Sequence, residues 1–89
     1  MKEKDITRFH EDQLKKFGKR LRQIRKEKNM SQVDLEVASG IYMAEISKME
    51  NGLQNIEFLT LSKLAFALGV EIQDFFKLEL LPPSDSEIK

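Results

Sequence analysis

The sequence has 89 residues, no cysteine and a formal net charge of zero. Its length predicts one small domain, and the lack of cysteine excludes a disulfide framework and a thiolate zinc site. No apolar run approaches the roughly 20 residues that cross a bilayer, and the charged start of the chain has no apolar signal core. We therefore expect a soluble cytoplasmic protein that does not enter a membrane.

The zero net charge hides an asymmetry between two parts of the chain. Residues 1–30 contain eleven Lys or Arg and five Asp or Glu, a net charge of +6, whereas residues 31–89 contain four and ten, a net charge of −6. A basic block of this kind is typical of a surface that binds a polyanion. It is equally typical of a solvated helix face, and charge alone leaves both interpretations open.

The first predicted helix ends at Asn29 and carries two stripes of side chains. An apolar stripe has intervals of three or four residues and contains Leu14, Phe17, Leu21 and Ile24. A basic stripe lies beside it and contains Lys15, Lys19, Arg22 and Lys26. Whether residues before about Glu11 extend this helix is left open by the pattern.

Two short predicted helices follow. Ser31 suits the N-cap of the second helix, with Asp34 as a weak capping-box partner. Gly40 suits a left-handed C-cap, and a third helix begins two residues later and ends at Gly52. Two short helices joined by a tight turn with glycine form the pattern of a helix-turn-helix.

The segment "IEFLTLSKLAFALG" predicts a fourth helix that ends at Gly69. Its inward-facing residues are expected to be Phe58, Leu61, Leu64, Ala65 and Leu68. A short fifth element, "VEIQDFFKLEL", precedes Pro82. Because short helices need longer ones behind them, we expect one all-α core that contains Leu35, Ile41, Ile46 and Met49 with Leu21, Ile24, Leu61 and Leu64.

From Phe17 to Phe76 the sequence resembles the Cro and phage-repressor type helix-turn-helix family, also called the xenobiotic-response-element family. The matching segments are "RLRQIRKEKNMSQVDL", Gly40-Ile41, "IS", "ENG" and "LSKLAFALGV". This resemblance implies a compact five-helix, lambda-repressor-like domain at residues 13–81, with the helix-turn-helix motif at about 32–51. A charged N-terminal extension, 1–12, would precede it, and a flexible polar tail, 82–89, would follow.

The resemblance also implies roles for residues of the motif. Gln32 would meet a phosphate at a helix N-terminus, Tyr42 would touch the sugar-phosphate backbone, and Asn51 matches a phosphate-contacting position. The positions that read base edges in the family are occupied by Met43, Ala44 and Lys48, with Glu45 and Ser47 as lesser candidates. Arg25 and Glu50 match a buried ion pair that ties the first helix to the third.

Two departures from the family pattern affect these roles. Glu36 stands where the family has a small residue, so its carboxylate must turn outward or find a cation, with Arg25 and Lys48 as candidates. The loop after Gly52, "LQNIEF", contains no Lys or Arg. We therefore expect fewer phosphate contacts from that loop and a lower affinity.

The fifth element is more apolar than a segment that only covers a small core. It is expected either to cover the core or to form a dimer surface, and we favour a use shared between the two. The candidate dimer residues are Ile72, Phe75, Phe76, Leu78, Leu80 and Leu81.

The sequence offers no catalytic, metal or cofactor site. His10 is the only histidine and lies in a charged segment, and no nucleophile–base pairing or glycine-rich phosphate loop is visible. We therefore expect a non-enzymatic regulator that binds double-stranded DNA as a homodimer on a palindromic operator. The alternative is an antitoxin-like protein-interaction module on the same fold with weak or no DNA reading, whose main partner is another protein.

Overall fold

The computed structural model describes residues 2–77. Within this range it contains no strand, and its elements are α1 (Glu3–Glu27), α2 (Gln32–Ser39), α3 (Met43–Glu50), α4 (Phe58–Leu68) and the 3₁₀ helix η1 (Ile72–Phe76). The all-α architecture is confirmed for this part of the chain. The expectation of five α-helices is wrong there, because the fifth element is a single short 3₁₀ turn. None of the described helices is long and apolar enough to cross a membrane.

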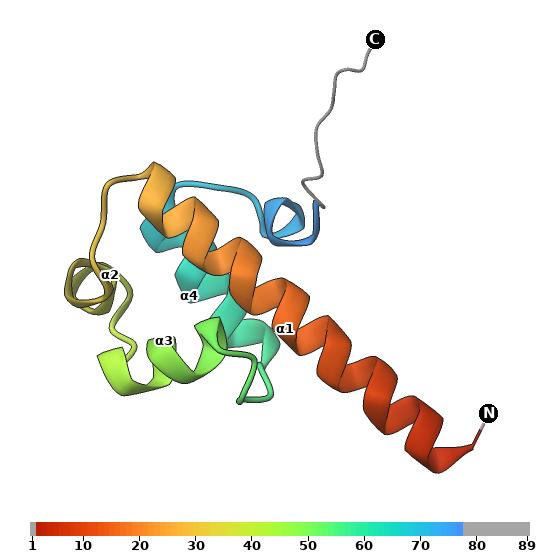
Figure 1. Ribbon diagram of the computed structural model, residues 1–89. Helices are drawn as coiled ribbons and strands as arrows, with labels where there is room; N and C mark the ends of the chain where they lie inside the picture. The colour runs from red at the N-terminus through yellow and green to blue at the C-terminus, as the bar shows by residue number, and fades with distance from the viewer. Residues whose placement is uncertain (1, 78–89) are drawn as a thin grey trace, which may run out of the picture.

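Helix α1 is the longest element and lies across the other helices (Figure 1). Its apolar stripe is buried at Phe17, Leu21 and Ile24, whereas Leu14 is half-buried. All residues from 3 to 13 are exposed, and this half of the helix projects beyond the packed body in Figure 1. The residues before Glu11 therefore extend the first helix, which starts at Glu3.

The start of α2 is held by the capping box that the sequence predicts. The Ser31 hydroxyl accepts a hydrogen bond of 3.0 Å from the Asp34 N–H, and the Asp34 carboxylate accepts one of 2.8 Å from the Ser31 N–H. The bond from the Ser31 N–H is the main reason that the pKa of Asp34 is below its usual value, because it favours the charged carboxylate. Gly40 ends the helix with a positive φ of 78°, a conformation that glycine adopts without strain.

A single apolar core joins all five elements. Its buried members are Phe17, Leu21, Ile24, Leu35, Ile41, Ile46, Met49, Leu64, Ala65, Leu68 and Phe75. Leu61 is only partly buried against this core, and Phe58 is 70% exposed, so the prediction that Phe58 faces inward is wrong. Phe58 is the first residue of α4, and the face of α4 that meets the core is set by residues one and two turns further on.

The 3₁₀ helix η1 folds back onto α1. The Arg20 Nε donates a hydrogen bond of 2.8 Å to the backbone carbonyl of Asp74, and the rings of Phe17 and Phe75 lie 5.5 Å apart between centroids. Phe75 is therefore a core residue and not the dimer contact that the sequence predicted, because only 1% of it is exposed. Phe76 is 59% exposed.

Of the remaining candidate dimer residues, Ile72 is half-buried. Leu78, Leu80 and Leu81 lie outside the described residues.

Candidate nucleic-acid interface

A buried ion pair connects α1 to the C-terminal end of α3. The Arg25 Nε donates to Glu50 Oε2 at 2.6 Å, and Arg25 Nη2 donates to Glu50 Oε1 at 2.9 Å. Both residues are buried, at 7% and 8% exposure. The hydrogen bonds to Glu50 are the main cause of a raised pKa for Arg25, so the guanidinium stays charged despite its burial.

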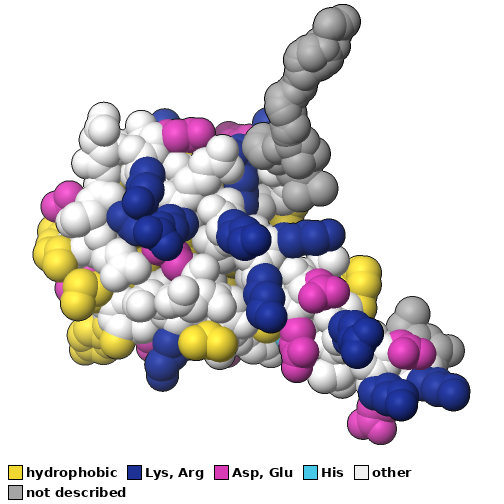
Figure 2. All heavy atoms as spheres, in the orientation of Figure 1, with side chains coloured by type: hydrophobic (Ala, Val, Ile, Leu, Met, Phe, Trp, Pro, Cys, Tyr) yellow, Lys and Arg dark blue, Asp and Glu magenta, His cyan; other side chains and the backbone are white. Residues whose placement is uncertain are grey.

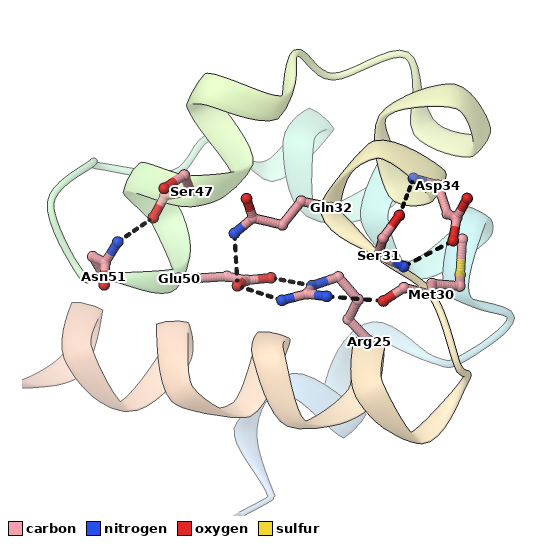
Figure 3. A network of polar contacts seen from close by, with 8 residues as sticks. All are labelled: Arg25, Met30, Ser31, Gln32, Asp34, Ser47, Glu50 and Asn51. Atoms are coloured by element: carbon pink, nitrogen blue, oxygen red, sulfur yellow. Dashed lines mark hydrogen bonds and ion pairs between the residues drawn. The ribbon is translucent and has the colours of Figure 1, made fainter.

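The same arginine also holds the turn between α1 and α2. Arg25 Nη1 donates a hydrogen bond of 2.8 Å to the backbone carbonyl of Met30 (Figure 3). Gln32, the first residue of α2, donates from Nε2 to Glu50 Oε1 at 3.1 Å. One carboxylate therefore orients both neighbouring helices relative to α3, and the Gln32 amide predicted to meet a phosphate is engaged with Glu50 in this structure.

Helix α3 buries one face and exposes the other. Ile46 and Met49 are buried in the core, and Ser47 is half-buried. The exposed residues at the start and along the outer face are Tyr42, Met43, Ala44, Glu45 and Lys48. Of the five predicted base-reading residues, Met43, Ala44, Glu45 and Lys48 are thus exposed and Ser47 is half-buried.

Asn51 closes the C-terminal end of α3. Its side-chain Nδ2 donates to the Ser47 carbonyl at 2.9 Å, and its backbone N–H donates to the carbonyls of Ser47 and Lys48. These bonds satisfy carbonyl groups that a helix end otherwise leaves without a partner. Asn51 remains exposed despite these bonds.

An open hollow of about 460 Å³ lies where α1, α2 and α3 meet. Its lining combines side chains from the three helices and their caps: Arg22, Arg25 and Lys26 of α1, Ser31, Gln32 and Val33 at the start of α2, Met43 and Glu50 of α3, and Asn51. Figure 2 shows Lys and Arg side chains gathered on this face, along α1. Cations beside a helix N-terminus provide a setting that suits a phosphate group.

The structure also bears on the two departures from the family pattern. Glu36 is half-buried, and one of its two candidate partners, Arg25, is committed to Glu50 and to the Met30 carbonyl. The loop between α3 and α4 exposes Leu53 at 73%, where the family resemblance implied basic residues. An apolar side chain in this place adds no attraction for phosphates.

Gly18 has a role that periodicity does not reveal. A Cβ at this position would lie 2.6 Å from the carbonyl oxygen of Glu50, and the Met49 carbonyl oxygen is also in contact with it. The absence of a side chain lets the end of α3 approach α1 closely. The available signal is a glycine inside a helical pattern, since glycine there usually lowers helix stability and so requires a packing reason.

Comparisons with known proteins agree with this geometry. The sequence pattern of the family described as Helix-turn-helix matches residues 21–75, which is more than half of the chain. The HTH-type transcriptional regulator y4dJ of Sinorhizobium fredii is 35% identical over 74 residues, covering 83% of this chain and 90% of that protein. Control protein C.BamHI of Bacillus amyloliquefaciens is 39% identical over 59 residues, covering 65% and 73%.

Among solved structures, the restriction-modification controller protein C.AhdI from Aeromonas hydrophila is similar to this chain. The two superpose with a TM-score of 0.72 at 37% sequence identity, over 73% of this chain and 98% of the other. The chain therefore belongs to the Cro/phage-repressor type helix-turn-helix family of DNA-binding transcriptional regulators.

Proposed function

We propose that the protein is a non-enzymatic regulator that binds a palindromic operator in double-stranded DNA as a homodimer. The observation that carries this proposal is the arrangement of two features on one surface. The outer face of α3 is exposed, and the hollow at the start of α2 is lined by Arg22 and Lys26. A helix for the major groove beside a cationic site for the backbone is the arrangement that helix-turn-helix proteins use.

The residues of this surface divide into two groups by their chemistry. Lys48 is the donor in the middle of the outer face of α3, with Met43 and Ala44 as apolar neighbours for thymine methyl groups. The phosphate contacts are assigned to the hollow, to the N–H groups at the start of α2, and to Tyr42 and Asn51 at the two ends of α3. Because phosphate contacts carry no sequence information, the base contacts of α3 determine specificity.

The test is selection of bound sequences from a random DNA pool, followed by binding to the selected site at several salt concentrations. About six phosphate contacts per dimer give a slope of log affinity against log salt of about −5. The selected site is expected to be a palindrome with half-site centres roughly 10 base pairs apart. A flat salt dependence together with no enriched palindrome would overturn the proposal.

Two observations support the alternative, a protein-interaction module with weak DNA reading. The loop after α3 exposes Leu53 without any basic residue, and residues 31–89 have a net charge of −6. Under this alternative the same selection yields no sequence preference. Binding to a protein encoded beside this gene would then be the main activity to measure.

The named relatives suggest which genes are regulated. Control protein C.BamHI and the restriction-modification controller C.AhdI share the fold and more than a third of the aligned residues with this chain. We extend the proposal to control of a nuclease and methyltransferase gene pair. The gene neighbourhood tests this extension, and its failure would leave operator binding itself untouched.

A further inference from the structure

The sequence contains three asparagines, and all of them are exposed: Asn29, Asn51 and Asn55. They differ in the residue that follows, because Asn51 precedes a glycine whereas the other two precede a methionine and an isoleucine. The backbone nitrogen of the following residue can attack the side-chain carbon of an asparagine. A glycine leaves that nitrogen unshielded, because it has no side chain beside it. Asn51 is therefore the asparagine most open to this reaction.

The reaction is a deamidation that exchanges bonds at the Asn51 side chain. The Gly52 nitrogen gives up its proton to solvent and forms a bond to Asn51 Cγ, and the Cγ–Nδ2 bond breaks. The amide nitrogen takes up a proton and leaves as ammonia. The five-membered imide that remains then adds one water molecule. Opening at Cγ gives aspartate, and opening at the main-chain carbonyl gives isoaspartate.

The turn after α3 requires the glycine of this pair. Gly52 has a φ of 71°, a value that residues with a side chain seldom adopt. A Cβ at this position would also lie 2.7 Å from Lys15 Cγ on α1. The reactive pair is therefore a consequence of how α3 ends against α1.

The folded turn keeps the two reacting groups apart. The Gly52 N–H donates a hydrogen bond of 3.1 Å to the Met49 carbonyl. The leaving group, Asn51 Nδ2, donates one of 2.9 Å to the Ser47 carbonyl (Figure 3). The ψ of Asn51 is 5°, and the ring closes only after rotation about its Cα–C bond brings the Gly52 nitrogen beside the side chain. The native conformation thus opposes the attack.

Few contacts have to break for that rotation. It moves the chain after Asn51, so it breaks the bond of Gly52 and the bond of 2.9 Å that the Leu53 N–H donates to the Lys48 carbonyl. The backbone N–H of Asn51 lies before the rotating bond and keeps its own bonds to α3. Turns with exposed hydrogen bonds and few buried contacts open at a lower free energy than the core. Glu50 stays buried and paired, so α3 remains against α1 while the turn opens.

We propose that Asn51 is a modification site that converts to aspartate and isoaspartate when the turn after α3 opens, and that the new carboxylate weakens DNA binding. Water is the only co-reactant, and the Gly52 nitrogen is the nucleophile. The folded turn sets the rate. Conversion then proceeds as a slow, irreversible step in a chain that is otherwise folded.

The consequence for DNA follows from the place of the new charge. Asn51 lines the same hollow as Arg22 and Lys26, so a carboxylate there would attract these cations and repel a phosphate. The Ser47 carbonyl would lose the hydrogen bond from Nδ2, and a negative charge at the C-terminal end of a helix is unfavourable. This consequence rests on the proposed function, whereas the modification itself does not.

The first test follows the full chain by peptide mass spectrometry in mildly alkaline buffer, folded and unfolded in guanidinium chloride. Asn51 should convert at least tenfold more slowly when folded, because three hydrogen bonds must break and each gives a bias of about two- to tenfold. Isoaspartate should form at position 51 in both samples, since direct hydrolysis of the amide gives aspartate alone.

Asn29 and Asn55 are internal controls in the same samples, because they are exposed like Asn51 but do not precede a glycine. In the unfolded chain both should convert more slowly than Asn51. Equal rates at Asn51 in the folded and the unfolded chain would overturn the proposal. So would controls that match Asn51 when unfolded, or a product without isoaspartate.

The second test separates opening of the turn from unfolding of the whole chain. The rate at Asn51 is measured at several guanidinium concentrations below the unfolding transition. Opening of the turn exposes little surface, so the rate should stay nearly constant across this range. A rate that rises in proportion to the unfolded fraction would show that the turn does not open by itself, and would contradict the proposal.

The third test uses substitutions that imitate the product. Asn51→Asp introduces the carboxylate, and Asn51→Ala removes the same amide without adding a charge. Binding of the selected operator should be at least fivefold weaker for the Asp variant than for the Ala variant at low salt, and the difference should shrink as salt rises. Equal binding by the two variants would show that the carboxylate does not act on DNA.

The modification and the proposed function can fail separately. Isoaspartate at position 51 of a protein that selects no DNA sequence would contradict the proposed function and leave the modification site standing. Sequence-specific binding by a protein whose Asn51 stays intact even when unfolded would contradict only the modification site.

Discussion

A Cβ on Gly18 would lie 2.6 Å from the carbonyl oxygen of Glu50, so α1 and α3 touch through their backbones at this point. Glu50 is the residue whose carboxylate accepts the two hydrogen bonds from Arg25. The close approach at Gly18 and the ion pair at Arg25 are about two turns apart on α1. Together they determine the angle of α3 against α1.

Gly18→Ala is therefore expected to destabilise the protein. An alanine in a helix is ordinarily more stable than glycine by roughly 0.5–1 kcal/mol, but here the new methyl group must push α3 away, and overpacking costs about 1–3 kcal/mol. The measurement is the urea midpoint, with Lys19→Ala at the exposed neighbouring position as the control. A midpoint higher than that of the natural protein would show that the two helices separate without cost.

Local features were predictable from the sequence because they depend on neighbouring residues. The capping box of Ser31 and Asp34 and the left-handed Gly40 were both expected and are both present. Each needs only a few adjacent positions. The same holds for the stripe of Phe17, whose spacing identifies the buried face of α1.

Features that depend on distant packing were not predictable in this way. Helix α4 is apolar on most of its surface, so periodicity does not tell which face meets the core, and Phe58 was assigned to the wrong side. Phe75 became a core residue because η1 folds back onto α1 through Arg20 and Asp74. That contact joins residues 54 positions apart, and no local pattern reports it.

Within the candidate site, the identity of the exposed residues of α3 followed from the sequence, and the family resemblance implied the ion pair of Arg25 and Glu50. The other contacts of the network behind α3 were not predicted. The engagement of Gln32 with Glu50 requires the two helix ends to meet in space. The hydrogen bond of Arg25 to the Met30 carbonyl likewise depends on the path of the turn. These contacts are tertiary. A sequence pattern can indicate which residues take part in them, but it does not show which atoms meet.

The ion pair of Arg25 and Glu50 gives a second prediction. Arg25→Met leaves Glu50 buried without its main partner, and breaking one half of a buried pair costs about 3–5 kcal/mol. The double variant Arg25→Met with Glu50→Leu removes both charges and should lose clearly less stability. Equilibrium unfolding in urea measures the stability of both variants. If the single and the double variant lose the same amount of stability, the unpaired buried charge of Glu50 is not the cause of that loss.

The capping box gives a pH-dependent prediction. The pKa of Asp34 is lowered from its usual value of 3.8, chiefly by the hydrogen bond that the Ser31 backbone N–H donates to the carboxylate. A lowered pKa contributes stability that is present above the unfolded value and lost as pH falls through the folded value. The advantage of the natural protein over Asp34→Asn should therefore be full near pH 6 and shrink below about pH 4.

Urea midpoints of the two proteins at matched pH values measure this difference. The other carboxylates titrate in both proteins, so their effects largely cancel in the comparison. Asp74, whose pKa is lowered chiefly by its hydrogen bond with Lys77, should remain unaffected by the substitution at Asp34. If the difference in urea midpoint between the two proteins stays constant from pH 6 to acid pH, Asp34 does not stabilise the helix start through its charge.

The last prediction concerns how α3 reads bases. Lys48 is exposed in the middle of the outer face, and Met43 is 42% exposed at its start. Lys48 is a charged donor suited to guanine O6 and N7, whereas Met43 offers only apolar contact to a thymine methyl group. Specificity should then rest on one charge-assisted contact and on methyl groups, so we expect it to be modest.

Lys48→Ala should relax the preference at one guanine position at a cost of roughly 1–3 kcal/mol. Met43→Gln should shift one position from thymine toward adenine, because a glutamine side chain can bond adenine N6 and N7 together. Selection from a random DNA pool with each variant measures both effects, and Lys63→Ala, an exposed cation on α4, is the control. If both substitutions weaken every sequence equally, α3 positions the protein on the phosphate backbone and leaves the bases unread, because phosphate contacts respond to charge and not to sequence.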